Sequence, residues 1–269
     1  AIADFTTAIE LDPQMIAAYT GRGYARREYG DLDGAVADFT TAIDLDPQNA
    51  IAYYGRGYAR RGYSDLDGAI ADFTTAIDLD PQDVVAYHSR GNVRYDQGDR
   101  EGAIVDYTTA IYLDPQDASL YNSRGNARYD LGDWEGAITD FTTAIELDPQ
   151  YFSAYYNRGR VRRNLGDQEG AIVDFTTAIE LNPQSSRAFY IRGLTRYEQG
   201  DLEIAIADFD RAIAISNNFA LAIGNRGRVY RLMGRFDKAI EDLSRALQLS
   251  PDRAWMQEEL EKARQGIRE

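Results

Sequence analysis

The chain has 269 residues and a formal net charge of -15 at pH 7, which disfavours binding to bulk nucleic acid and to anionic membranes. It contains no cysteine and only one histidine, His88, which argues against disulfides, thiol chemistry, His-based metal sites and catalytic triads. No apolar run approaches the roughly 18 residues of a membrane span. We therefore expect a cytoplasmic, non-enzymatic protein that uses no cofactor and no metal.

A 34-residue period runs through the chain and is marked by proline. All seven prolines fall on this grid: Pro13, Pro47, Pro81, Pro115, Pro149, Pro183 and Pro251. Asn217 occupies the one grid point that lacks a proline. A fixed period of this size is typical of stacked helical repeats, which bury their apolar faces only against their neighbours. The sequence therefore predicts one elongated, all-α solenoid rather than two globular domains.

Residues 50–83 illustrate the repeat. Helical spacing of apolar residues predicts a first helix over about 50–63 and a second over about 66–79. Ser64-Asp65 separates them, and other repeats have Gly-Asp at this point. Gly ends a helix at little cost because it tolerates positive φ, and Asp is a strong N-cap. Pro81 then stops the second helix, so the repeat is a pair of antiparallel helices joined by short turns.

The repeat resembles the tetratricopeptide repeat (TPR). The family pattern of Trp, Leu-Gly, Tyr, Ala, Phe and Pro maps onto Tyr53, Arg56-Gly57, Arg60, Ala69, Phe73 and Pro81. The resemblance covers essentially the whole chain. It implies a right-handed superhelix of helix pairs whose concave groove binds a partner.

The period divides the chain into a partial repeat, seven full repeats and a tail. The full repeats are 16–49, 50–83, 84–117, 118–151, 152–185, 186–219 and 220–253. Residues 1–15 are expected to form the second helix of a truncated repeat. Residues 254–269 are expected to form a C-terminal capping helix with the apolar stripe Met256, Leu260, Ala263 and Ile267.

The N-terminal helix is predicted to expose apolar side chains. Ile2, Phe5 and Ile9 lie where a preceding first helix would cover them. An uncovered apolar end normally finds a partner. We therefore expect the natural protein to extend further N-terminally, and this end to allow homo-oligomers.

Each repeat carries an Arg and an Asp at fixed positions. The Arg precedes Gly in the first helix, where the family usually has Leu: Arg22, Arg56, Arg90, Arg124, Arg158, Arg192 and Arg226. The Asp lies in the second helix: Asp38, Asp72, Asp106, Asp140, Asp174, Asp208 and Asp242. A carboxylate is the natural bidentate partner of a buried guanidinium, so we predict a structural ladder of Arg–Asp pairs. The functional alternative is a repeated anion site. The Thr pairs of the second helix, such as Thr40-Thr41, are interpreted as exposed surface without chemistry.

Residues that vary between repeats identify the candidate binding face. Every repeat must satisfy the same packing, so variable positions are freer to serve a partner. In the first helix they are the second, fifth, ninth and twelfth residues of each repeat, which share one helical face. We call these positions the variable stripe. In proteins that resemble this one, this face lines the groove.

The composition of the variable stripe favours binding. Its 28 positions hold seven Arg, eight Tyr and no acid, although 44 of the 269 residues are acidic. Tyr and Arg are frequent hot-spot residues at binding interfaces. The alternative for any single stripe tyrosine is that it packs against the next repeat and has no role in binding. Glu28, Asp96, Asp130 and Glu198 lie one residue beyond the stripe and can neutralise part of its charge. The candidate groove residues are Tyr24, Arg27, Tyr54, Tyr58, Arg61, His88, Asn92, Tyr95, Asn122, Asn126, Tyr129, Tyr156, Arg160, Arg163, Tyr190 and Tyr197.

The best-known binding mode implied by the resemblance is a clamp of Lys, Asn and Arg around a C-terminal carboxylate. Asn92 and Asn126 match its asparagine, but His88 and Asn122 stand where it requires Lys. This departure disfavours a role as a cochaperone of that type.

The favoured function is a scaffold that binds a protein or an extended peptide of acidic or aromatic character. One alternative is a targeting or regulatory module of a larger enzyme lying before Ala1. Another is an array that self-assembles through its N-terminal end. Reading of single-stranded RNA by helical repeats is disfavoured by the acidic charge and the near identity of the repeats.

Overall fold

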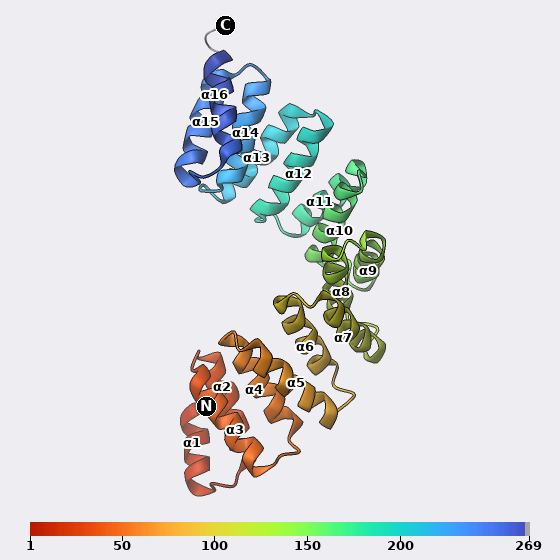
Figure 1. The fold of residues 1–269 in the computed structure, drawn as a ribbon, viewed down its shortest axis with the longest axis vertical. Coiled ribbons are helices and arrows are strands. Elements are labelled where there is room, and N and C mark those ends of the chain that lie inside the picture. The colour runs from red at the N-terminus through yellow and green to blue at the C-terminus, as the bar shows by residue number, and fades with distance from the viewer. Residues whose placement is uncertain (267–269) are drawn as a thin grey trace. The chain divides into compact units, whose positions relative to one another are not determined.

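The computed structural model describes residues 1–266, and its regular structure in that range is entirely α-helical (Figure 1). The chain divides into two compact blocks, Ala1–Leu147 and Asp148–Glu269. The N-terminal block contains α1 (Ile2–Leu11), α2 (Ile16–Glu28), α3 (Leu32–Leu45), α4 (Ala50–Gly62), α5 (Leu66–Leu79), α6 (Val84–Gln97), α7 (Arg100–Leu113), α8 (Ala118–Asp130) and α9 (Trp134–Leu147). The C-terminal block contains α10 (Phe152–Asn164), α11 (Gln168–Leu181), α12 (Ser186–Gln199), α13 (Leu202–Ile215), α14 (Ala220–Leu232), α15 (Phe236–Leu249) and α16 (Ala254–Gly266).

Within each block, consecutive helices pack in antiparallel pairs, and each pair packs on the next. The predicted all-α array of helix pairs is thereby confirmed.

The predicted Asp caps stand between the two helices in five of the seven full pairs, whereas Asp201 and Arg235 make no side-chain cap. Asp31, Asp65, Asp99, Asp133 and Asp167 each accept a hydrogen bond from the backbone N–H three residues later, at 2.9–3.1 Å. In six repeats the residue before the second helix's N-cap is a glycine in the left-handed region, with φ between 72° and 94°: Gly30, Gly98, Gly132, Gly166, Gly200 and Gly234. In one repeat Ser64 takes this conformation, with φ 63°.

The core depends on a close approach of an aromatic ring to glycines of two repeats. Phe39 of α3 is fully buried. A Cβ atom at Gly23, in the same repeat, would lie 2.9 Å from the Phe39 ring, and one at Gly55, in the next repeat, would lie 2.4 Å away. A larger residue at Gly23 would therefore separate the two helices of the pair, which explains why glycine recurs at this position in all seven full repeats. The Gly55 position is less restricted, since it holds Ser, Asn or Ile in later repeats.

The predicted Arg–Asp ladder is present in every full repeat. Each pair is bidentate, with Nε 2.7–3.0 Å from Oδ2 and Nη2 2.7–2.8 Å from Oδ1. The carboxylates are almost fully buried, and Asp106 is only 1% exposed. These pairs are internal, which confirms the structural interpretation over a repeated anion site.

The ladder includes two further groups that the sequence analysis missed. In six repeats a second arginine donates to the same aspartate at 2.8–3.0 Å: Arg26, Arg60, Arg94, Arg128, Arg162 and Arg196. The ladder arginine also reaches the preceding repeat, as where Arg56 Nη1 donates to Thr40 Oγ1 at 3.2 Å. The interpretation of the first threonine of each pair as mere exposed surface is therefore wrong. In the sixth full repeat Asp210 replaces this threonine and pairs with Arg226 of the last repeat at 2.5 Å.

The first and last helices differ in how far they are covered. In α1 no residue is buried, and Ile2, Phe5 and Ile9 are half-buried, with Phe5 lying against Gly21 of α2. In α16, three side chains of the expected stripe are buried in the core of the last repeats: Met256, Leu260 and Ala263. Ile267, the fourth, lies outside the described residues.

Replacing Ser64 with glycine is expected to stabilise the protein. The left-handed conformation costs an L-residue about 1–2 kcal/mol, and glycine removes this strain. Part of the stabilisation is lost because glycine also makes the unfolded chain more flexible. Ser64→Gly should raise the free energy of unfolding by up to about 1 kcal/mol in urea titrations followed by circular dichroism. The reverse change Gly98→Ser, at the equivalent turn, should lower it. A shift in the same direction for both variants would contradict this account.

Removing one ladder carboxylate is expected to destabilise the protein strongly. Asp106→Asn leaves the partly buried Arg90 and Arg94 without their anion, which should cost about 3 kcal/mol in the same titration. Glu101→Gln removes the same charge from the exposed start of α7 and should cost at most about 0.5 kcal/mol. Equal losses for the two variants would show that net charge, rather than the ladder, sets the stability.

Candidate functional site

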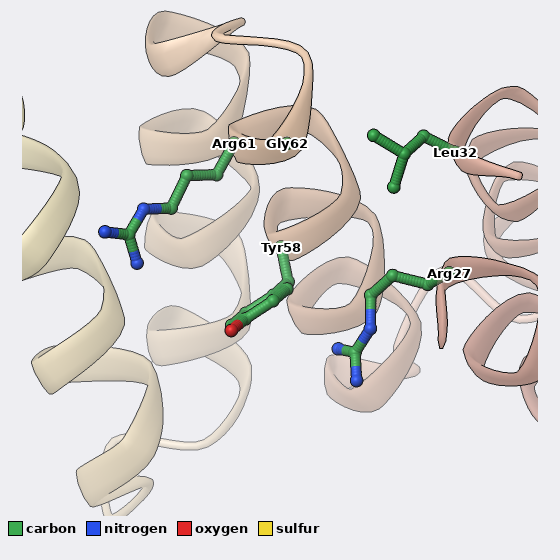
Figure 2. A pocket seen from close by; sticks show the side chains of 5 residues that line it. All are labelled: Arg27, Leu32, Tyr58, Arg61 and Gly62. Atoms are coloured by element: carbon green, nitrogen blue, oxygen red, sulfur yellow. The ribbon is translucent and has the colours of Figure 1, made fainter. Parts of the chain in front are cut away.

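Residues of the variable stripe line three separate pockets. In the N-terminal block, a pocket of about 500 Å³ is lined by Arg27, Leu32, Tyr58, Arg61 and Gly62 (Figure 2). A smaller pocket of about 90 Å³ in the same block is lined by Asn92, Tyr95, Tyr107, Ser123 and Asn126. In the C-terminal block, a pocket of about 420 Å³ is lined by Tyr156, Arg160, Arg187, Tyr190, Ile191, Phe219 and Leu221. A further concavity, at residues 249–253, lies off the stripe.

Two stripe tyrosines of the N-terminal block are held against the core. The Tyr24 ring meets Phe39 edge-on, with 5.0 Å between centroids, and the Tyr54 ring lies 5.5 Å from Phe73. Each phenylalanine belongs to the same repeat as its tyrosine. These two tyrosines are therefore packing residues as well as groove residues. Both also reach the next repeat, because the Tyr24 hydroxyl donates to the Ile51 carbonyl at 3.3 Å and Tyr54 packs on the buried clusters that contain Ala86 and Val93.

Tyr58 is an exposed tyrosine of the stripe and lies beside two stripe arginines. Tyr58 is 41% exposed, and the Arg27 guanidinium carbon lies 4.5 Å from its ring centroid. Arg61 follows on the same helix, and its Nη2 donates to Asp96 Oδ2 at 2.8 Å. Figure 2 shows the Tyr58 ring between the two guanidinium groups.

His88 and Asn92 on α6 form a polar patch against the next repeat. His88 Nε2 lies 3.0 Å from Ser123 Oγ, and its ring meets Tyr107 edge-on at 5.7 Å. The Tyr107 hydroxyl donates to Asn92 Oδ1 at 2.8 Å. Burial lowers the pKa of His88 below its ordinary value of 6.5; Arg61 lowers it as well, and Asp117 acts in the opposite direction.

The other candidates of the N-terminal block differ in accessibility. The Tyr95 hydroxyl donates to Asp130 Oδ2 at 2.6 Å, and Arg100 lies over the Tyr95 ring at 4.2 Å. Asn126 lines the smaller pocket, whereas Asn122 is only 9% exposed and Tyr129 is half-buried. Because Asn122 is covered, it offers a partner little surface.

In the C-terminal block, aromatic rings form the floor of the pocket. Tyr156 stacks on Phe152 with 6.0 Å between centroids and 16° between planes. Tyr190 lies 4.9 Å from Phe219, and the Asn225 amide donates to its hydroxyl at 3.3 Å. Burial raises the pKa of Tyr190, which keeps its hydroxyl neutral.

The three remaining candidates of this block have different surroundings. Arg160 Nη1 lies 3.5 Å from Asn157 Oδ1. Arg163 forms a bidentate pair with Glu198, with Nε 3.0 Å from Oε2. Tyr197 packs against a buried cluster of α13 and α14.

Three of the four acids beside the variable stripe pair with stripe residues of the preceding repeat. Asp96 pairs with Arg61, Asp130 accepts from Tyr95, and Glu198 pairs with Arg163, each across 35 residues. The position of these acids beside the stripe was expected from the sequence, but their partners were not. Each paired acid lies 35 residues after its stripe partner, and this constant separation could have predicted the pairs from the sequence. The stripe is consequently less positive than its composition indicates.

Two kinds of site are absent from the part of the chain that the structure describes. Within residues 1–266, no three acidic or histidine side chains are arranged to hold a metal ion. No helix in this range combines the length and apolarity needed to cross a bilayer.

The sequence matches family models over most of its length. Models described as "TPR repeat" match residues 23–62, 64–98, 91–132 and 125–166. Models described as "Tetratricopeptide repeat" match residues 156–218 and 220–253. No curated protein sequence matches the chain.

Solved structures share the fold. The crystal structure of the APC/C hetero-tetramer Cut9-Hcn1 matches with a TM-score of 0.69 and 22% identity, over 97% of this chain and 52% of that one. This chain therefore spans about half the length of that relative. YrrB, described as "a TPR protein with an unusual peptide-binding site", matches with a TM-score of 0.57 and 26% identity, over 68% of this chain and 95% of YrrB. The C-terminal part of a TPR protein from Cytophaga hutchinsonii matches with a TM-score of 0.72 and 16% identity, over 90% and 99% of the two chains.

The lowered pKa of His88 predicts a pH-dependent contribution to stability. The unfolded chain binds the histidine proton near pH 6.5, whereas the folded chain binds it only at lower pH. Between these two values the unfolded state holds more protons. The free energy of unfolding should therefore fall as pH decreases through about 6.5 and level off below the folded pKa.

The matched variant is His88→Asn, because Asn122 stands at the equivalent position of the next repeat. Urea titrations at about pH 7.5 and about pH 5.5 should show a larger loss for the natural chain than for this variant. An equal loss for both proteins would mean that burial does not perturb His88.

Proposed function

Because the chain belongs to the tetratricopeptide repeat family, whose members are typically non-catalytic scaffolds that mediate protein–protein interactions, we propose that it binds an extended segment of a partner protein along the variable stripe. It acts as a scaffold and not as an enzyme.

The observation that carries this proposal is the position of the pockets. Three separate concavities lie on the stripe, and stripe residues supply most of the lining of each. A face whose residues vary between otherwise similar repeats is thus also the face that is hollowed. Helix packing does not require a face to be both variable and hollowed. Recognition of different side chains along an extended segment requires both.

The lining of the C-terminal pocket indicates the chemistry of the segment. Tyr156, Tyr190 and Phe219 provide aromatic surface, and Arg160 and Arg187 provide positive charge, while no acid lines the pocket. Guanidinium groups form strong bidentate contacts with carboxylates, and Tyr and Arg dominate binding hot spots. These residues suit a segment in which carboxylates alternate with large apolar side chains.

A relative supports peptide binding by this fold. YrrB is 26% identical, and its description names a peptide-binding site. The two alternative functions, a module of a larger enzyme and a self-assembling array, stay predictions because no observation favours either.

Binding is expected to depend on two exposed stripe residues, one in each block. Peptides selected from a random display library on the natural chain would be labelled with fluorescein and titrated by anisotropy. Tyr58→Ala should weaken peptides bound to the N-terminal block about tenfold, and Arg187→Ala should do so for the C-terminal block. Affinity should also fall as salt is added, because the contacts include ion pairs.

A control variant changes the same residue types away from the stripe. Tyr112, on α7, is 85% exposed, and Arg264, on α16, has 51% of its side chain exposed. Tyr112→Ala with Arg264→Ala should change affinity by less than about twofold. If the selected peptides respond to the control and not to Tyr58→Ala or Arg187→Ala, the stripe is not the binding face.

A further inference from the structure

Two stripe arginines form ion pairs with carboxylates that lie 35 residues later, in the next repeat. Arg61 takes the Asp96 carboxylate at 2.8 Å, and Arg163 takes the Glu198 carboxylate in a bidentate contact. In both, the cation is the twelfth residue of one repeat and the anion is the thirteenth residue of the next. The chain thus contains two internal examples of a carboxylate bound to this arginine position.

The first full repeat has the cation without the anion. Arg27 stands at the same position as Arg61 and Arg163, but the residue 35 positions later is Gly62. Within residues 1–266 the Arg27 guanidinium has no ion pair and no side-chain hydrogen bond; its contacts are the faces of Tyr58 at 4.5 Å and Tyr24 at 5.3 Å. A cation over aromatic faces still has its N–H donors available at the ring edges.

A pocket occupies the space beside this cation. Arg27, Leu32, Tyr58, Arg61 and Gly62 line its volume of about 500 Å³, and no acidic side chain lines it (Figure 2). Because Gly62 has no side chain, the pocket lacks the carboxylate that the thirteenth position supplies in other repeats, and only the tip of Leu32 lies close to where a Gly62 Cβ atom would be. Leu32 and the exposed Tyr58 ring add apolar surface next to the charge.

We propose that this pocket binds an aspartate or glutamate side chain of the partner segment, whose carboxylate takes on Arg27 the role that Asp96 has on Arg61. This inference rests on the proposed function and names the residue type recognised at one point of the stripe. A carboxylate fits better than a phosphate, because Arg61 is already paired and one unpaired cation matches one negative charge. Leu32 and Tyr58 favour an apolar residue adjacent to the acid.

The first test places the missing carboxylate in the protein. Gly62 ends α4 without a positive φ, and a Cβ atom there would come close only to the tip of Leu32, at 2.8 Å. The Gly62→Asp variant should therefore fold. Its introduced carboxyl group, titrated by NMR, should have a pKa below the ordinary value of about 3.9, because Arg27 favours the charged form. The further change Arg27→Gln should return that pKa to the ordinary range. A pKa that is not lowered, or that ignores Arg27→Gln, would overturn the inference without any peptide.

The second test uses fluorescein-labelled peptides selected on the natural chain and weakened by Tyr58→Ala, which places them on the N-terminal block. Gly62→Asp should weaken these peptides at least about tenfold, because the introduced carboxylate occupies Arg27. Gly62→Asn, of the same size but uncharged, should change affinity by less than about threefold. Replacing the acid of the peptide by its amide should remove the difference between the two variants.

The outcomes separate this inference from the proposed function. If peptides bind the stripe but Gly62→Asp and Gly62→Asn act alike, or if no selected peptide responds to Tyr58→Ala, the acidic site at Arg27 is wrong and binding elsewhere on the stripe stands. If no peptide depends on any stripe residue, the proposed function fails, and the NMR titration still decides whether Arg27 receives a carboxylate.

Discussion

The bidentate contact between an arginine of the first helix and an aspartate of the second is the interaction on which the repeat depends. Two parallel hydrogen bonds to a buried carboxylate tolerate little change in the distance or rotation of the two helices. A buried ion pair contributes less to stability than its Coulomb energy suggests, but it is strongly unfavourable to separate. Arg56 also donates to Thr40 of the preceding repeat, so one guanidinium sets both the geometry within a pair and the register between pairs.

The ladder also explains why the binding face is free to vary. Its arginines and aspartates, together with the Phe–Gly contacts of the core, supply what every repeat needs for packing. The variable stripe then differs between repeats without loss of the fold. Its charge is set by pairs and not by composition: Arg61 and Arg163 are neutralised by acids of the next repeat, whereas Arg27 lies over two aromatic faces and has a glycine at the equivalent acid position.

Much of the fold was predictable because its determinants are local or strictly periodic. The turn glycines and Asp caps act within a few residues, and the Arg–Asp pairs recur with the same 16-residue separation in every repeat. The second arginine, such as Arg60, and the contact to Thr40 were missed. Arg60 was assigned only to a family pattern position, and the threonine contact crosses between repeats, where side-chain reach decides the outcome.

The candidate site was predictable only in outline. The sequence by itself determined the 34-residue period, the helix pairs, the internal ladder and the identity of the variable face, because each follows from comparing copies that obey the same packing. The tertiary structure decided which of those variable residues are available. It buried Asn122, held Tyr24 against Phe39, paired Arg61 with Asp96 and left Arg27 beside an open pocket. The physical reason is that exposure and pairing depend on the neighbouring repeat, whose side chains approach only once the helices have packed.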